Sequence, residues 1–176
     1  EGVTTMAEEV VDVRPAEVAD ATQLLALLAQ LGRESNTFTV DEGIEDLSET
    51  DEQEQIAHIN GTTTNIIFVA TLASQLIGVS TVQASTDFSA AQGEVGVAVL
   101  KEFWGMGLGT ALIEEVLDWA RNYSTLERLV LTVQLRNVRA IKLYRRLGFE
   151  NCTSTSYDVV DPTGKRVAAI DMEMWV

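Results

Sequence analysis

Three glycines stand at alternate positions in the segment F-W-G-M-G-L-G-T-A-L, residues 103–112, directly before an apolar pattern with helical spacing. A glycine inside a helix or strand costs roughly 0.5–1 kcal/mol relative to alanine, so this cluster indicates a backbone that is needed for more than packing. Free N–H groups at the start of a helix bind anions, and phosphates in particular. The segment therefore predicts a phosphate-binding turn, with a tight turn and close helix packing as the alternative.

The two common nucleotide motifs do not fit this turn. A P-loop requires Gly-Lys-Ser or Gly-Lys-Thr, and the turn contains no lysine. A dinucleotide fingerprint requires a third glycine where Thr110 stands, and an acidic residue at the end of the next strand, which ends instead in Thr132 and Gln134. The phosphate ligand must therefore be of another kind.

A second motif lies at residues 137–149, N-V-R-A-I-K-L-Y-R-R-L-G-F, and places Asn137, Ala140 and Tyr144 on one helical face. Together with the glycine segment it resembles the signatures of the GNAT superfamily of CoA-dependent N-acyltransferases, Q/R-x-x-G-x-G/A and N-x-x-A-x-x-L-Y-x-x-x-G-F. The order of the expected elements also agrees, so the resemblance covers nearly the whole chain. Trp104 departs from the pattern, because it stands where the family usually has Gln or Arg.

The resemblance implies that the chain binds acetyl-CoA through main-chain groups, with no metal. The strand before the glycines would hydrogen-bond the pantetheine, the turn would hold the pyrophosphate, and Asn137 would contact the cofactor, cap its helix, or do both. The implied cofactor-binding residues are Val97, Ala98, Val99, Trp104, Gly105, Met106, Gly107, Leu108, Gly109, Thr110 and Asn137.

Two residues are implied as catalytic. Tyr144 matches the tyrosine that protonates the departing CoA thiolate, although an aromatic residue on an apolar helix face is more often part of the core. An amine acceptor arrives protonated and must lose a proton before it attacks a thioester. Glu94 resembles the glutamate that many members use for this step, directly or through water, with a surface carboxylate as the alternative. His58, the only histidine, is a second candidate base or a surface helix residue.

Charge is unevenly distributed along the chain. The net charge of −15 disfavours nucleic acid or an anionic membrane as a partner. No lysine or arginine lies between Arg33 and Lys101, whereas residues 41–54 carry eight acids. A basic cluster follows at Arg136, Arg139, Lys142, Arg145 and Arg146. Charge runs of this kind usually lie on solvated faces, which is the simpler explanation of both stretches. The functional interpretation is a cationic substrate on the acidic half and an anionic one on the basic half.

Composition and length favour one folded domain over residues 6–176. Residues 1–5 precede Met6 and are set aside as a remnant or a disordered start. Cys152 is the only cysteine, which excludes an internal disulfide and metal sites built on paired cysteines. A lone cysteine and the lack of a ~20-residue apolar run or a secretory signal favour a cytoplasmic protein, and a homodimer is left open.

The hydrophobic pattern predicts an α+β fold. Expected strands are 10–15, 65–73, 75–85, 93–100, 128–134 and two around the turn at 161–164; expected helices are 19–32, 41–60, 107–123 and 137–149. By resemblance they form a GNAT-like mixed, mainly antiparallel sheet of about seven strands flanked by about four helices. The expected function is direct transfer of an acetyl group from acetyl-CoA to a primary amine of a small cationic molecule. A protein or peptide N-acetyltransferase and a non-catalytic acyl-CoA-sensing module are the alternatives.

Overall fold

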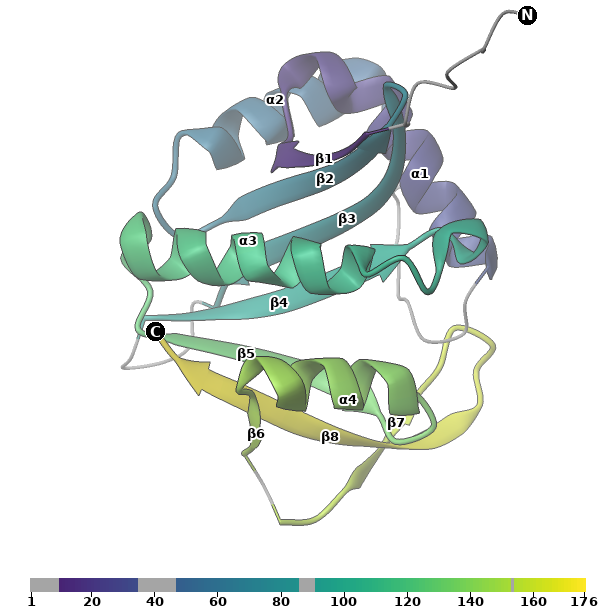
Figure 1. Ribbon diagram of the computed structural model, residues 1–176, viewed down its shortest axis with the longest axis vertical. Helices are drawn as coiled ribbons and strands as arrows, with labels where there is room; N and C mark the ends of the chain where they lie inside the picture. Colours follow the sequence, from purple (N-terminus) through teal and green to yellow (C-terminus); the bar gives the residue numbers. More distant parts are fainter. Residues whose placement is uncertain (1–9, 35–46, 86–90, 153) are drawn as a thin grey trace, which may run out of the picture.

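The computed structural model describes residues 10–34, 47–85, 91–152 and 154–176, and its centre is an eight-stranded sheet (Figure 1). The strand order is β1-β2-β3-β4-β5-β8-β6, and β7 pairs with β8 beside β6. The strands are β1 Val11–Pro15, β2 Ile66–Leu72, β3 Gln75–Ala84, β4 Gln92–Val99, β5 Arg128–Gln134, β6 Glu150–Asn151, β7 Tyr157–Val160 and β8 Arg166–Trp175. The predicted fold class is confirmed.

Helices cover both faces of the sheet. They are α1 Ala21–Glu34, α2 Glu49–Asn60, α3 Leu108–Asn122 and α4 Val138–Leu147, with short 3₁₀ turns η1 Val18–Asp20 and η3 Lys101–Phe103. Helices α3 and α4 lie on one face, and α1 and α2 lie on the other (Figure 1). The predicted apolar stripe of α3, from Leu108 through Leu112 and Val116 to Trp119, is buried against the sheet.

Capping residues in the sequence explain where α2 and α4 begin. Ser48 caps α2 by accepting a hydrogen bond from the Asp51 N–H, while the Asp51 side chain accepts from the Ser48 N–H. Asn137 caps α4 by accepting from the Ala140 N–H, as expected from its type. The helix expected over 41–60 is present from Glu49; its predicted residues 41–46 lie outside the described part of the chain. The two-residue β6 was not predicted, because so short a strand has no alternation to recognise.

Strands β4 and β5 pair only at their first residues. They are parallel, whereas the other neighbouring strands described are antiparallel, and their register joins Gln92 to Arg128, Gly93 to Leu129 and Glu94 to Val130. Beyond these three pairs β4 stays with β3 as far as Val99, while β5 stays with β8 as far as Gln134. The two strands therefore diverge, and Figure 1 shows the gap widening away from the C-terminus.

Arg128 holds the closed end of this gap. Its guanidinium donates to Gln92 Oε1 on β4 at 2.8 Å and forms a salt bridge with Glu173 on β8. It also stacks over the Trp175 ring, with Cζ 5.6 Å from the centroid. One side chain thus ties the first residues of β4 and β5 to the end of β8.

We expect Arg128→Met to lower the free energy of unfolding by about 2 kcal/mol, because two hydrogen bonds to a charged group are lost and Glu173 is left without its partner. For a chain of this size the melting temperature should fall by roughly 4–8 °C. Arg166→Met, an exposed arginine on β8, is the matched control and should change little. Equal melting temperatures for the two variants would show that Arg128 does not stabilise the junction of β4, β5 and β8.

Candidate active site

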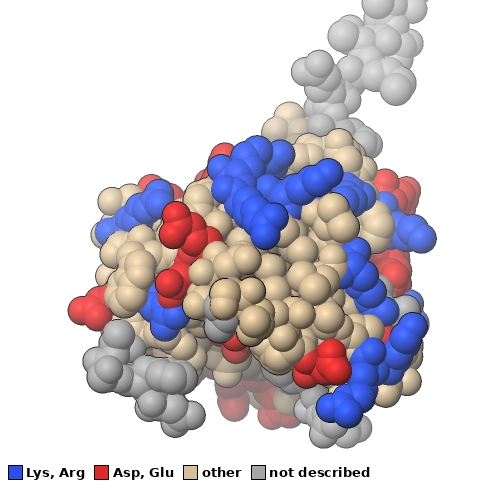
Figure 2. All heavy atoms as spheres, turned by 90° about the horizontal axis from the view of Figure 1, so that it is seen from below, with Lys and Arg blue, Asp and Glu red and all other residues tan. Residues whose placement is uncertain are grey.

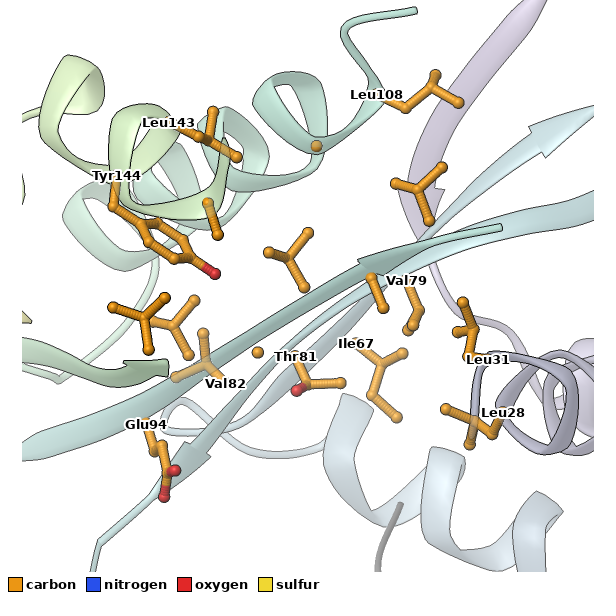
Figure 3. Close-up of a pocket in the computed structure, with 18 of the residues that line it drawn as sticks. Leu28, Leu31, Ile67, Val79, Thr81, Val82, Glu94, Leu108, Leu143 and Tyr144 are labelled. Atoms are coloured by element: carbon orange, nitrogen blue, oxygen red, sulfur yellow. The ribbon is translucent and has the colours of Figure 1, made fainter. Parts of the chain in front are cut away.

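A cavity of about 1230 Å³ fills the gap between β4 and β5 and continues beneath α1 and α2. Sites for one small ligand are usually ~300–1,000 Å³, so this volume is large enough for two molecules. Its lining comes from the glycine turn, α4, β4 and β5 at one end, and from α1, α2, β2 and β3 at the other. Figure 3 shows Tyr144 and Glu94 toward one end and Leu28 and Leu31 of α1 toward the other.

The β4 backbone presents unpaired polar groups to this cavity. In an antiparallel ladder, alternate residues direct both N–H and C=O toward the partner strand. At the two ends of β4, the Ser85 N–H donates to the Gln92 carbonyl and the Leu100 N–H donates to the Ile77 carbonyl, both at 2.9 Å. The even-numbered residues of β4 therefore direct their backbone N–H and C=O groups toward β3. Val97 and Val99 therefore direct their backbone groups into the gap, while those of Ala98 point to Val79 on β3.

One of these groups already has a partner. The Trp104 indole Nε1 donates to the Val99 carbonyl at 2.8 Å. Both backbone groups of Val97 and the N–H of Val99 remain directed at the gap. Of the three residues expected to bind a cofactor through their main chain, Val97 and Val99 have the orientation for it and Ala98 does not.

The glycine turn has the backbone geometry of an anion site. Gly105 and Gly107 adopt φ of +83° and +78°, and a Cβ added to either would meet nothing within 4 Å. The first backbone bond at the start of α3 runs from the Ala111 N–H to the Gly107 carbonyl, so the N–H groups of Leu108, Gly109 and Thr110 have no helical acceptor. Gly109 has a packing reason instead, since a Cβ there would lie 3.3 Å from Leu143 Cδ2 on α4. The packing explanation therefore applies to Gly109, while the positive φ of Gly105 and Gly107 and the free N–H groups are compatible with phosphate binding, which stays a prediction.

Cationic side chains surround this turn. Lys101 and Arg139 both lie over the Trp104 ring, with Lys101 Nζ and Arg139 Cζ at 5.9 and 5.2 Å from its centroid. Arg146 donates to Thr110 Oγ1 at 2.7 Å, and Arg139, Lys142 and Arg146 all line the cavity.

Two members of the basic cluster are placed differently. Arg136 forms a salt bridge with Asp161 at 2.9 Å, and Arg145 lies outside the lining. Figure 2 shows Lys and Arg side chains concentrated in the upper and right-hand parts of one face, with most of its middle formed by uncharged residues.

Tyr144 is buried on α4 with its hydroxyl directed into the cavity toward the strands (Figure 3). Its ring packs edge-to-face on Phe149 at a centroid distance of 5.7 Å. Burial raises the pKa of the phenol to about 12, so the hydroxyl keeps its proton at any lower pH. Tyr144 is thus a core aromatic whose protonated hydroxyl faces the cavity.

Glu94 reaches the cavity from the opposite face of β4. Val95 is buried beneath α3, so the alternation of the strand places Glu94 and Gly96 on the face of α1 and α2. The Glu94 side chain is exposed and points away from Tyr144 in Figure 3. The two residues predicted as catalytic therefore border one cavity from opposite faces of the sheet.

A polar cluster beside Glu94 was not predicted. Asp171 on β8 accepts hydrogen bonds from Thr132 Oγ1 at 2.7 Å and from the Tyr157 hydroxyl at 2.5 Å. Burial, the bond to Asp171 and the charge of Glu94 all raise the pKa of Tyr157. These residues come from β5, β7 and β8. The register of β5 with β8 places Thr132 opposite Asp171, and the register of β7 with β8 brings Tyr157 to the same region.

Comparison with known proteins agrees with this architecture. The profile of the Acetyltransferase (GNAT) family matches residues 21–149, so the chain belongs to that family. An acetyltransferase of the GNAT family from Streptococcus pneumoniae is 27% identical with a TM-score of 0.86, and the match covers 95% of this chain and 100% of that one. A phosphinothricin acetyltransferase from Sinorhizobium meliloti, in complex with AcCoA, shares the fold at 19% identity, with a TM-score of 0.77 over 94% of this chain and 88% of that one.

Two curated relatives match shorter stretches. The L-amino acid N-acetyltransferase AaaT of Escherichia coli is 31% identical over 43% of this chain and 41% of its own length. An N-alpha-acetyltransferase of Sulfurisphaera tokodaii is 36% identical over 32% of this chain and 34% of its own. The chain therefore aligns with less than half of each relative.

Two features are absent from the residue ranges that the structure describes. No helix in those ranges is long and apolar enough to cross a membrane. Within the same ranges, no group of His, Cys, Asp and Glu side chains has the arrangement of a metal site.

We expect Gly107→Ala to lower the free energy of unfolding by about 1–2 kcal/mol, because alanine must adopt the left-handed conformation although its Cβ meets open space. Gly61→Ala is the matched control, since Gly61 ends α2 with φ −87° and tolerates a side chain. Urea unfolding of both variants measures the difference. A Gly107→Ala variant as stable as the control would mean that the turn relaxes to another conformation.

Proposed function

We propose that the protein transfers an acetyl group from acetyl-CoA to a primary amine of a small cationic molecule. The observation that carries this proposal is the gap between β4 and β5, which opens one cavity to both faces of the sheet. The α3 and α4 side offers backbone N–H groups and cations, and the other side offers carboxylates. Two substrates of opposite charge can therefore meet at the gap without competing for the same surface.

The donor fits the residues on the α3 and α4 side. Gly105, Gly107 and the first N–H groups of α3 would hold the pyrophosphate, supported by Arg139, Lys142 and Arg146. The backbone of Val97 and Val99 would hydrogen-bond the amide groups of an extended pantetheine, as a partner strand would. The free N–H groups in the same row are suited to stabilise negative charge on the thioester oxygen.

Acetyl-CoA supplies a thioester, whose carbon–sulfur bond breaks as the amine nitrogen bonds to the acetyl carbon. Glu94 removes a proton from the incoming ammonium group, directly or through water, which frees the nitrogen lone pair. Tyr144 donates its hydroxyl proton to the departing sulfur, for which its raised pKa keeps it protonated. The second proton, which the acetylated nitrogen loses as the amide forms, returns to the Tyr144 phenolate, directly or through water. The opposite faces from which these side chains reach the cavity suit an amine that attacks from the side away from the leaving group.

The charged residues on the α1 and α2 side of the cavity favour a cationic acceptor. No lysine or arginine lies between residues 33 and 101, the stretch that contributes the α2, β2, β3 and β4 lining. Glu52 and Glu94 contribute carboxylates to the same lining. The named activities of the two curated relatives, on L-amino acids and on α-amino groups, support a primary amine. The second also favours a peptide N-terminus as the alternative acceptor.

The direct test is release of the CoA thiol from acetyl-CoA against a panel of amines. The panel contains 1,4-diaminobutane, spermidine, butylamine, a neutral amino acid and a short peptide with a free N-terminus. We expect the di- and tricationic amines to react fastest and their rates to fall as salt screens the attraction. Fastest release with the peptide would favour the alternative acceptor, and binding of acetyl-CoA without release against any amine would indicate a sensing module.

Tyr144→Phe removes only the hydroxyl and keeps the ring against Phe149, so we expect unchanged stability and acetyl-CoA affinity. Turnover should fall by ~10²-fold, the low end for a lost general acid, because a thiolate leaves more easily than an alkoxide. Tyr144→Ala is the control for packing and should lower the free energy of unfolding by roughly 3–5 kcal/mol. Normal turnover in Tyr144→Phe would leave the residue a structural role only.

Glu94→Gln should lower turnover most near pH 7 and least at high pH, where the acceptor is already a free amine. Acetyl-CoA affinity should hold, because the side chain lies on the other face of β4. Glu115→Gln on the exposed side of α3 makes the same change of charge and should match the wild type. A wild-type pH profile in Glu94→Gln would transfer the role to water or to another carboxylate.

A further inference from the structure

Glu52 on α2 is a buried carboxylate that has no partner among the described residues. Its residue is 3% exposed and lines the cavity. No hydrogen bond or salt bridge joins its side chain to any other residue in the described ranges. The other two buried acids of the described residues each form a salt bridge: Asp20 with Arg14 at 2.7 Å, and Asp161 with Arg136 at 2.9 Å.

The carboxylate of Glu52 opens into the cavity rather than into sealed core. Among the described residues, no side-chain nitrogen or oxygen is both fully buried and without a hydrogen bond. The small exposed area of Glu52 therefore includes its oxygens, and Glu52 is one of the residues that line the cavity. Such a group is costly to bury in its charged form, and burial raises its pKa.

Neither helix capping nor the protein core uses this carboxylate. Asp51 forms the capping box of α2 with Ser48, and Ile56 one turn later supplies the buried apolar contact of the helix. Gln55 and His58 continue the same side of α2 along the cavity wall, and Leu28 and Leu31 of α1 border it. Glu34 of α1 also lines the cavity, but its carboxylate accepts hydrogen bonds from Gln30 and from the Lys101 N–H. Among the described residues, Glu52 is thus the acid of the α1 and α2 wall that has no such partner.

We propose that Glu52 binds a second cationic group of the acceptor, separate from the amine that is acetylated. This inference rests on the proposed function and narrows its substrate class to small molecules with at least two positive charges, such as diamines and polyamines. Glu94 receives the reacting amine beside the gap, and Glu52 receives the distal ammonium group below α2. The bound cation would supply the partner that the chain itself does not provide, and low exposure would make that ion pair stronger than one at the surface.

The test compares Glu52→Gln with Glu54→Gln, which removes the same charge from an exposed position two residues along α2. The probes are 1,4-diaminobutane and butylamine, which differ in the distal ammonium group. We expect the wild type to prefer the diamine, and Glu52→Gln to lower the diamine-to-butylamine ratio of kcat/KM by roughly tenfold or more. Glu54→Gln should keep the wild-type ratio.

Binding and stability give readouts that do not need turnover. Diaminobutane should raise the melting temperature of the wild type and of Glu54→Gln but not that of Glu52→Gln. Without ligand, Glu52→Gln should be at least as stable as the wild type, because an unpaired buried charge has been replaced by a neutral amide; a purely structural role would lower its stability.

An unchanged ratio and an unchanged diamine-induced shift in Glu52→Gln would overturn the proposal while leaving the acetyltransferase function in place. If the wild type acetylates no amine, the proposed function fails, and the diamine-induced shift alone decides whether Glu52 is a cation site.

Discussion

The three residue pairs that join β4 to β5 are the constraint on which the rest of the site depends. Parallel pairing stops after Glu94 and Val130, although both strands continue with their outer neighbours. Beside Val97 and Val99, β5 is therefore too far away to form hydrogen bonds with their backbone groups, and the cavity lies between the two strands instead. A longer ladder would pair those groups and close the passage between the two faces, and a shorter one would separate the sheet into halves.

The charged side chains that line the cavity are also divided between the two faces of the sheet. Arg139, Lys142 and Arg146 gather where the glycine turn and α4 meet the cavity, while Glu52 and Glu94 reach it from the face of α1 and α2. The net charge of −15 hides this separation, because it is a sum over the whole chain. A strongly acidic protein can thus still hold a polyanion locally, provided that backbone N–H groups and a few cations are concentrated at one helix start.

The sequence predicted those features that depend on neighbours along the chain. Alternate glycines before an apolar helix identified the turn, Asn137 identified the start of α4, and Tyr144 fell on a helical face that could be computed from spacing alone. It did not predict that Ala98 turns its backbone away from the gap, which depends on the hydrogen-bond phase of β3 and β4. Nor did it predict the contact of Thr132, Tyr157 and Asp171, whose positions only the long-range register fixes. Glu52 was missed for another reason: in a run of acids every carboxylate appears solvated, and only packing singles out the buried one.

The unpaired side of β4 is, in effect, a sheet edge inside the protein. Edge strands on a surface invite pairing with other chains, and proteins usually blunt them with charge, proline or bulges. Here the glycine turn, α4 and the diverging β5 line the space beside this edge, so a partner reaches it by entering the cavity. The same backbone that would invite pairing at the surface is thereby reserved for molecules that fit between those walls and carry groups able to pair with a peptide backbone.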